Sequence, residues 1–173
     1  MKRTFEPWIG SKYWTKGLDG KRVLILGESH YGEVGLEYAG LTIDVVREWG
    51  QKKRLRFFTV CQKLIQGPGK DDWVSDQQRR DFWEHVSFYN YVQSFPGPEP
   101  RYRPNAEMWA GGMEPFLFTL DELEPDVLIV LGYELAEHIL VVPEGIRVCR
   151  IQHPSSRGFR YANWWPMIER ALA

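Results

Sequence analysis

The sequence of 173 residues contains little cysteine, with only Cys61 and Cys149. Two cysteines, each within an apolar segment, predict small buried side chains rather than a disulfide framework. They are also too few for a four-cysteine zinc or iron–sulfur site, so we expect no metal and no cofactor. Because disulfides accumulate in oxidising compartments, the expected location is a reducing cytoplasm.

Long apolar runs and an excess of charge are lacking as well. No apolar run approaches the ~20 residues of a membrane-spanning helix, and no signal-peptide pattern opens the chain, so we expect no membrane contact. The formal net charge is −1, which excludes a general positive field for nucleic acid and leaves only a local patch. The length and the absence of internal repeats predict one domain over residues 1–173.

Short apolar runs that alternate with amphipathic segments are what the sequence does contain. Four runs predict buried strands, at residues 22–26, 86–92, 127–132 and 146–151. Helices are expected between and after them, at residues 41–49, 57–65, 75–85, 105–123 with an interruption at 111–115, 133–140 and 164–172. This alternation predicts an α/β three-layer sandwich with a central four-stranded parallel sheet. Residues 1–20 are expected to form an irregular N-terminal arm laid over apolar surface.

Polar side chains lie where three of these strands end. Glu28 follows the first strand, Asn90 lies in the second, and His153 follows the fourth. Right-handed crossovers bring the carboxyl ends of parallel strands to one edge, where ligands bind in open α/β sheets. We therefore expect the three side chains to line one cleft. Each also has an ordinary structural alternative, as a cap, a loop hydrogen bond or a turn.

The order of these features resembles the uracil-DNA glycosylase superfamily from about residue 22 onward. Members carry a first motif such as Gly-Gln-Asp-Pro-Tyr-His or Gly-Glu-Ala-Pro-Gly, and a second such as His-Pro-Ser-Pro-Leu-Ser. Residues 27–32 read Gly-Glu-Ser-His-Tyr-Gly, and residues 153–156 read His-Pro-Ser-Ser. The resemblance implies a single uracil-DNA glycosylase-like domain.

The resemblance also implies roles for particular residues. Glu28 would stabilise the oxocarbenium-like sugar and position water, and His153 would donate to the departing base. Asn90 would read the flipped base, and Tyr31 would crowd out a 5-methyl group. Stacking on the base would come from Phe58 or another early aromatic residue. His30 is a further base-binding candidate, and the DNA-binding or phosphate-binding candidates are Ser29, Ser155, Ser156, Arg157 and the wedge residue Phe159.

The chain departs from the superfamily pattern at several positions. Ser29 stands where the best-known members carry a catalytic aspartate, and His30 replaces a proline. Residues 157–159, Arg-Gly-Phe, replace the usual wedge segment. The class that shares Gly-Glu often carries an iron–sulfur cluster, which two cysteines do not hold.

Three functions fit the sequence. The first is a DNA glycosylase that flips and excises a deaminated base such as uracil, from single- or double-stranded DNA. The second is a hydrolase of a free nucleoside derivative, which the near-neutral charge favours, and the third is a non-catalytic nucleic-acid-binding or nucleotide-binding member. A serine hydrolase built on Ser29 is disfavoured because the Gly-x-Ser-x-Gly motif is absent. The expected partner is thus DNA or a small nucleotide, and the expected oligomeric state is a monomer.

Overall fold

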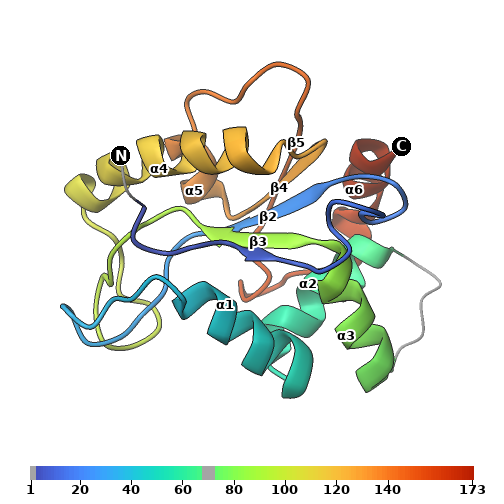
Figure 1. The fold of residues 1–173 in the computed structure, drawn as a ribbon, viewed down its shortest axis with the longest axis horizontal. Helices are drawn as coiled ribbons and strands as arrows, with labels where there is room; N and C mark the ends of the chain where they lie inside the picture. The colour runs from blue at the N-terminus through green and yellow to red at the C-terminus, as the bar shows by residue number, and fades with distance from the viewer. Residues whose placement is uncertain (1–2, 68–72) are drawn as a thin grey trace.

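A five-stranded sheet forms the centre of the computed structural model, which describes residues 3–67 and 73–173 (Figure 1). The strand order is β1-β3-β2-β4-β5. The strands are β1 (Trp8–Ile9), β2 (Val23–Gly27), β3 (Ser87–Asn90), β4 (Val127–Leu131) and β5 (Arg147–Ile151). Strands β2 to β5 pair in parallel, whereas β1 pairs antiparallel with β3. The α/β class is confirmed, but the sheet is five-stranded and mixed rather than four-stranded and wholly parallel.

The additional strand, β1, lies within the segment that was expected to be an irregular arm. Trp8 pairs with Phe88, and the Trp8 Nε1–H donates to the carbonyl of Trp83 at 2.8 Å. The Ser87 hydroxyl in turn donates to the Trp8 carbonyl at 2.5 Å. A strand of two residues carries no periodic pattern, so the sequence alone does not reveal it. Residues 1–2 of the arm lie outside the described residues.

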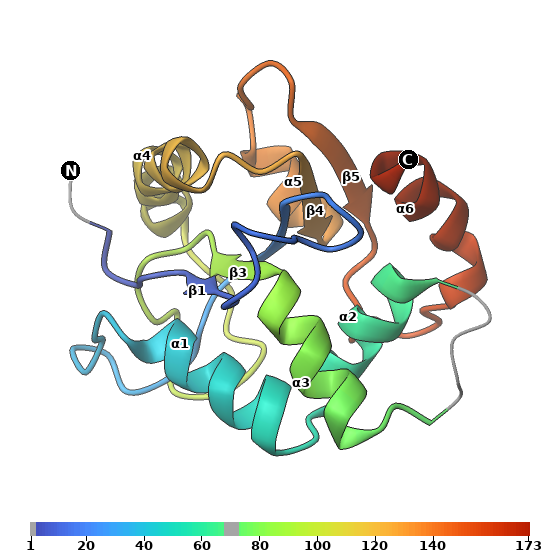
Figure 2. The same ribbon diagram turned by 45° about the vertical axis from the view of Figure 1, so that its right-hand side comes forward.

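Helices cover both faces of the sheet and produce three layers (Figure 2). One face carries α1 (Leu41–Val45) with its π-helical continuation η1 (Val46–Lys52), α2 (Arg56–Gln66), α3 (Asp76–His85) and α6 (Trp165–Leu172). The other face carries α4 (Ala106–Leu123) and α5 (Tyr133–His138). A 3-10 turn, η2 (Tyr161–Asn163), precedes α6.

Alternation along β2 shows how one strand serves both layers. Val23 and Ile25 belong to the core under α2, α3 and α6, whereas Leu24 and Leu26 belong to the core under α4 and α5. Successive side chains of a strand point to opposite faces. A strand that is covered on both sides therefore needs a continuous apolar run, as the sequence has here.

Helix α4 differs from its expected form because it continues without interruption through Pro115. The Asn105 side chain caps it, accepting from the Met108 N–H at 2.9 Å, which confirms the expected start. Gly112 lies against Tyr91, the residue after β3, where an added Cβ would be 2.4 Å from the Tyr91 ring. Tertiary packing of the helix on the sheet outweighs the low helix propensity of these residues.

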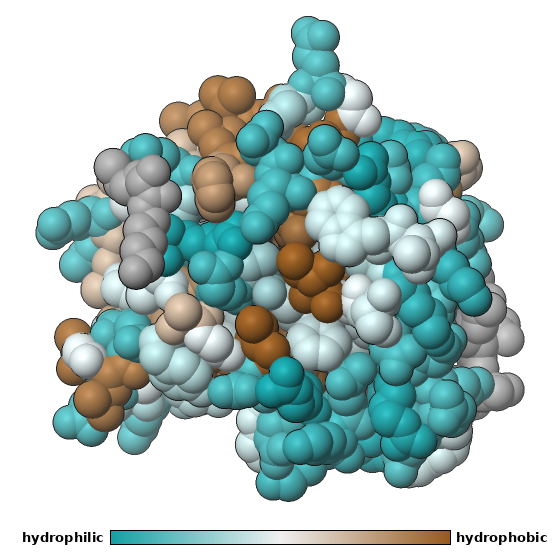
Figure 3. Space-filling view, in the orientation of Figure 1, coloured by the Kyte–Doolittle hydropathy of each residue, from teal (hydrophilic) through white to brown (hydrophobic). Residues whose placement is uncertain are grey.

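Three further expectations from the sequence concern a helix cap, the cysteines and membrane-spanning helices. Ser75 and Gln78 form the expected capping box at the start of α3, and Cys61 and Cys149 are buried and free. In the described part of the chain, no helix has the length and apolar character needed to cross a membrane. The face drawn in Figure 3 is mainly hydrophilic, with apolar residues in small separate groups.

Candidate active site

The carboxyl ends of the four parallel strands meet at one edge of the sheet. Gly27 at the end of β2 pairs with Asn90 at the end of β3, and Leu131 of β4 pairs with Ile151 of β5. After β3 the chain crosses over β2 to reach β4, so the strand order reverses between β2 and β4. Such a reversal is where open α/β sheets leave room for a ligand.

Asn90 presents an unpaired carboxamide at this edge. It alternates with Phe88 along β3 and therefore faces the α2 layer. Only 5% of the residue is exposed, and no group among the described residues hydrogen-bonds its side chain. Gly27 makes this position possible, because a Cβ there would lie 2.2 Å from Asn90 Oδ1. The Asn90 amide atoms are not among the fully buried polar atoms that lack a partner, so they border solvent at the sheet edge and are open to a ligand there.

His153 is held as a neutral imidazole beside α2. Its ring stacks on Phe57, with centroids 5.5 Å apart and planes at 23°. The backbone N–H of Ser155 donates to His153 Nδ1 at 3.1 Å, which places the ring proton on Nε2. Burial, aided by the positive charge of Arg103, lowers the pKa of His153 from its ordinary value. The imidazole therefore offers an Nε2–H donor at neutral pH.

Glu28 comes directly after β2, on the side of α5. Its side chain is 16% exposed, and its two oxygens accept from the two terminal nitrogens of Arg103, each at 2.8 Å. Arg103 also pairs with Glu134 on α5. Burial raises the pKa of the Glu28 carboxyl above its ordinary value, although Arg103 opposes this shift. The carboxyl group thus combines a shielded position with a single strong cationic partner.

Arg103 connects Glu28 with His153, and Phe57 connects His153 with β3, the strand that ends at Asn90. The Phe57 ring lies 6.2 Å from Phe88 of β3 and 5.5 Å from His153, which links the end of β3 to the loop after β5. The positive charge of Arg103 lowers the pKa of both Glu28 and His153. The carboxamide and the imidazole thus lie on the α2 side of the edge, and the carboxylate lies on the α5 side.

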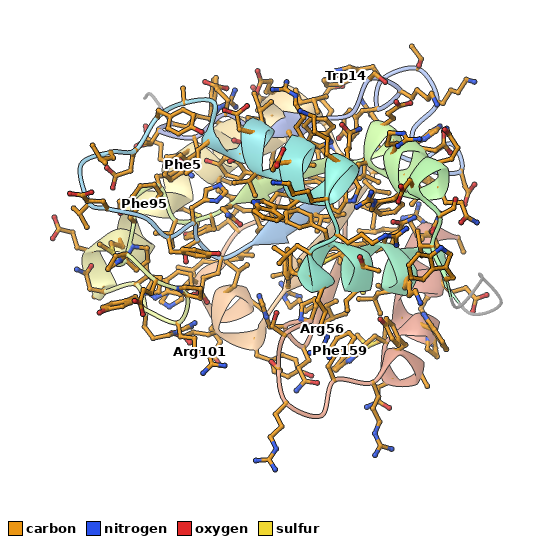
Figure 4. The ribbon with its side chains drawn as sticks, turned by 90° about the horizontal axis from the view of Figure 1, so that it is seen from below. Phe5, Trp14, Arg56, Phe95, Arg101 and Phe159 are labelled. Carbon is orange, nitrogen blue, oxygen red and sulfur yellow. The ribbon has the colours of Figure 1, made fainter. Side chains whose placement is uncertain are left out.

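Two expected base-binding residues have other roles in the structure. His30 is 7% exposed, hydrogen-bonds Thr42 Oγ1 at 2.8 Å and meets the Phe5 ring edge-on. Phe5 in turn stacks on Phe95, with ring centroids 5.8 Å apart, and Figure 4 shows the two residues close to each other. Burial lowers the pKa of His30 to about 4. These contacts occupy the ring, so His30 packs the N-terminal arm instead of contacting a base.

Phe58 is buried in the core and does not reach the sheet edge, so it is not the ring that stacks on a base there. It is 3% exposed and packs in the core against Trp83 and Phe88. The preceding residue, Phe57, is half-buried and reaches the edge of the sheet. Consecutive helical residues point about 100° apart, so Phe58 is enclosed by the core while Phe57 packs at its border and also reaches His153.

The other expected contacts are spread around the edge. Tyr31 is 55% exposed, Ser29 and Ser156 are half-buried, and Ser155 and Arg157 are exposed. Phe159, expected to be a wedge, is half-buried and meets the ring of Tyr161 edge-on at 5.7 Å. It leans on the core next to α2 rather than standing free. The phosphate-binding roles of Ser29, Ser155, Ser156 and Arg157 stay predictions.

The comparisons with known proteins leave the site to be interpreted from its geometry. No family model matches the sequence, and no curated protein matches it. Within residues 3–67 and 73–173, no group of three or more histidine, cysteine or acidic side chains is arranged to hold a metal ion.

Three residues of the site escaped the sequence reasoning. Arg103 contacts Glu28 and Phe57 contacts His153 directly, whereas Glu134 reaches the site through Arg103. Arg103 is 75 positions from Glu28 in the chain, in the proline-rich loop between β3 and α4. This loop leaves the same edge of the sheet, so an arginine within it was the signal available in the sequence. The distance along the chain conceals the ion pair between Arg103 and Glu28.

Proposed function

We propose that the protein is a DNA glycosylase-like hydrolase that cleaves the N-glycosidic bond of a flipped, deaminated base such as uracil. The observation that carries the proposal is that the Asn90 carboxamide and a neutral His153 lie on the α2 side of one sheet edge, with Glu28 on the α5 side. A carboxamide offers a donor and an acceptor side by side, which match the acceptor and donor on the edge of uracil. Phe57 supplies an aromatic surface on the same side.

The chemistry follows the charges that develop as the bond breaks. The bonding electron pair leaves with the base, and the sugar carbon C1′ gains oxocarbenium character. Glu28 stabilises that positive charge and orients a water molecule whose oxygen adds to C1′ while its proton passes to the carboxylate. The His153 Nε2–H donates to the base oxygen on which negative charge accumulates.

The ion pair with Arg103 still allows Glu28 to bind the attacking water molecule. A carboxylate accepts about four hydrogen bonds, and Arg103 takes one on each oxygen. The remaining lone pairs suffice for a water molecule. The same ion pair supports a second candidate, a non-catalytic nucleic-acid-binding or nucleotide-binding protein, because it satisfies the charge of Glu28 without substrate.

The test is release of a base from oligonucleotides. Duplexes and single strands that contain uracil, hypoxanthine or xanthine are incubated with the protein, and abasic sites are detected by alkaline cleavage. We expect product with at least one substrate. Glu28→Gln should reduce the rate by about 10²–10⁴-fold, and His153→Ala by about 10²–10³-fold.

Glu134→Gln is the matched control, because Glu134 shares Arg103 with Glu28 but lies on α5. It removes one charge from the same ion-pair group and should retain most activity. Equal losses in Glu28→Gln and Glu134→Gln would trace the effect to the ion pair and count against a catalytic Glu28. Absence of product from every oligonucleotide, together with DNA binding, would favour the non-catalytic candidate, and turnover of free nucleosides alone would favour a nucleoside hydrolase.

A further inference from the structure

A basic and aromatic groove lies next to the candidate site. It has a volume of about 470 Å³ and is lined by residues that include Arg54, Arg56, Lys63, Trp73 and Tyr161. Three cations within one hollow contrast with the net charge of −1 for the whole chain. The groove is therefore a local positive patch of the kind that the overall charge leaves open.

The groove adjoins the site at two points. Arg56, the first residue of α2, precedes Phe57, whose ring stacks on His153. On the opposite wall, Tyr161 meets Phe159 edge-on at 5.7 Å, and Phe159 ends the loop that begins at His153. Figure 4 shows Arg56 and Phe159 in the same region of the molecule. A chain in the groove thus lies beside the two segments that carry Phe57 and the loop of the imidazole.

The side chains of the groove suit a nucleic-acid strand with unpaired bases. Trp73 is 69% exposed, and the Arg54 guanidinium lies 4.1 Å from its ring centroid, which leaves much of the ring for a stacked base. Arg54 is also paired with Asp76 at 2.8 Å. Arg56 is exposed and has no ion-pair partner among the described residues, so it is available to a phosphate. Exposed aromatic rings among cations are typical of single-strand binding, because every base has a face to stack.

We propose that this groove binds single-stranded DNA, with Arg56 on the backbone phosphates and Trp73 stacked on a base next to the one held at His153. A strand with unpaired bases fits because bases in a duplex are stacked on one another and do not reach Trp73. The inference rests on the proposed function in one respect, which is that the neighbouring base is held at His153. Binding through the groove itself needs no damaged base.

The test uses a fluorescent single-stranded oligonucleotide of ordinary bases and the matching duplex, with binding measured by anisotropy over a range of salt concentrations. We expect the single strand to bind at least about ten-fold more tightly than the duplex. Trp73→Ala should weaken binding by about ten-fold or more through lost stacking. Arg56→Ala should lower the slope of log K against log salt concentration by about 0.7, the value for one phosphate of a single strand.

Arg147→Ala is the matched control, since Arg147 lies at the amino end of β5, whereas the loop to His153 leaves the carboxyl end of this strand. It should bind like the wild type. The inference is overturned if the duplex binds as tightly as the single strand, or if Trp73→Ala and Arg56→Ala bind like the wild type. Because Trp73 and Arg56 are exposed, their loss leaves the core intact.

Failure of the groove and failure of the proposed function give different results. Groove-dependent binding without base release by any substrate would uphold the groove and reject the glycosylase activity. Base release that is equally fast in the wild type, Trp73→Ala and Arg56→Ala would reject the groove and uphold the activity. Slower release from single strands in both variants, with Glu28→Gln still able to bind, would support both proposals.

Discussion

Burial keeps His30 and His153 neutral, but the two rings differ in which nitrogen atom remains free to bind a ligand. His30 uses Nε2 for its hydrogen bond with Thr42, and its ring packs against Phe5 of the N-terminal arm. His153 uses Nδ1 to accept from the Ser155 N–H, so its Nε2–H remains a donor. Burial lowers the pKa of both imidazoles. The pKa alone therefore does not distinguish the two residues. His30 is structural because its Nε2 already has a partner, and His153 is a catalytic candidate because its Nε2–H has none among the described residues.

His30 should make the fold sensitive to acid. Its folded-state pKa is about 4, compared with an ordinary value of 6.5. Between these values the unfolded chain binds a proton that the folded protein excludes, so stability falls as pH drops from about 6.5 to about 4. The full loss is about 3 kcal/mol from this group. His30→Gln does not titrate and should lose less stability over that range, measured by urea unfolding at pH 7 and pH 4.5.

The His30 prediction has a clear failing outcome. If wild type and His30→Gln lose the same free energy of unfolding between pH 7 and pH 4.5, burial of the imidazole is not responsible. The carboxyl groups are common to both proteins, so their contribution cancels in the comparison.

Residue positions were predictable from sequence where a strand end fixed them. Glu28 and His153 follow apolar runs and Asn90 lies in one, and parallel strands bring such residues to one edge. The direction of a helical side chain was not predictable in the same way. Phe57 and Phe58 are identical in type, and only the packing of α2 on the sheet decides which one is buried.

At the scale of elements, the apolar runs and caps carried most of the information. Strands β2, β4 and β5 lie within one residue of their expected limits, and the capping residues Ser75 and Asn105 start α3 and α4. The expected interruption of α4 at residues 111–115 is wrong, because glycine there has a packing role. A sequence pattern shows low propensity but does not show which surface the helix approaches.

Adjacent glycines of α4 should respond in opposite directions to alanine. At Gly112 a Cβ would lie 2.4 Å from the Tyr91 ring and 2.7 Å from the Tyr91 carbonyl oxygen, so Gly112→Ala should destabilise the protein by about 1–3 kcal/mol. At Gly111 nothing lies within 4 Å, so Gly111→Ala should stabilise it by about 0.5–1 kcal/mol. Chemical unfolding of both variants measures the difference. Equal effects would show that α4 does not approach Tyr91 this closely.

At the scale of the whole molecule, the candidate site is an assembly of segments that are distant in sequence. Arg103 comes from the loop after β3, Glu28 from the end of β2, and Glu134 from α5. One guanidinium therefore joins three segments at the reversal point of the sheet. Its charge favours the ionised form of Glu28 and the neutral form of His153, which are the two forms that the proposed reaction requires.

Arg103→Gln should consequently shift the pH dependence of base release. Without the positive charge, the pKa of Glu28 rises further and the lowering of the His153 pKa is reduced. Each change moves loss of the active form to higher pH, so the acid limb of the kcat/KM profile should move upward while the rate at alkaline pH changes less. Profiles of wild type and Arg103→Gln on the same oligonucleotide measure the shift. Glu134→Gln leaves Arg103 in place and removes a negative charge that raises the pKa of Glu28, so its acid limb should not move to higher pH. An unmoved limb in Arg103→Gln would mean that neither Glu28 nor His153 controls the rate.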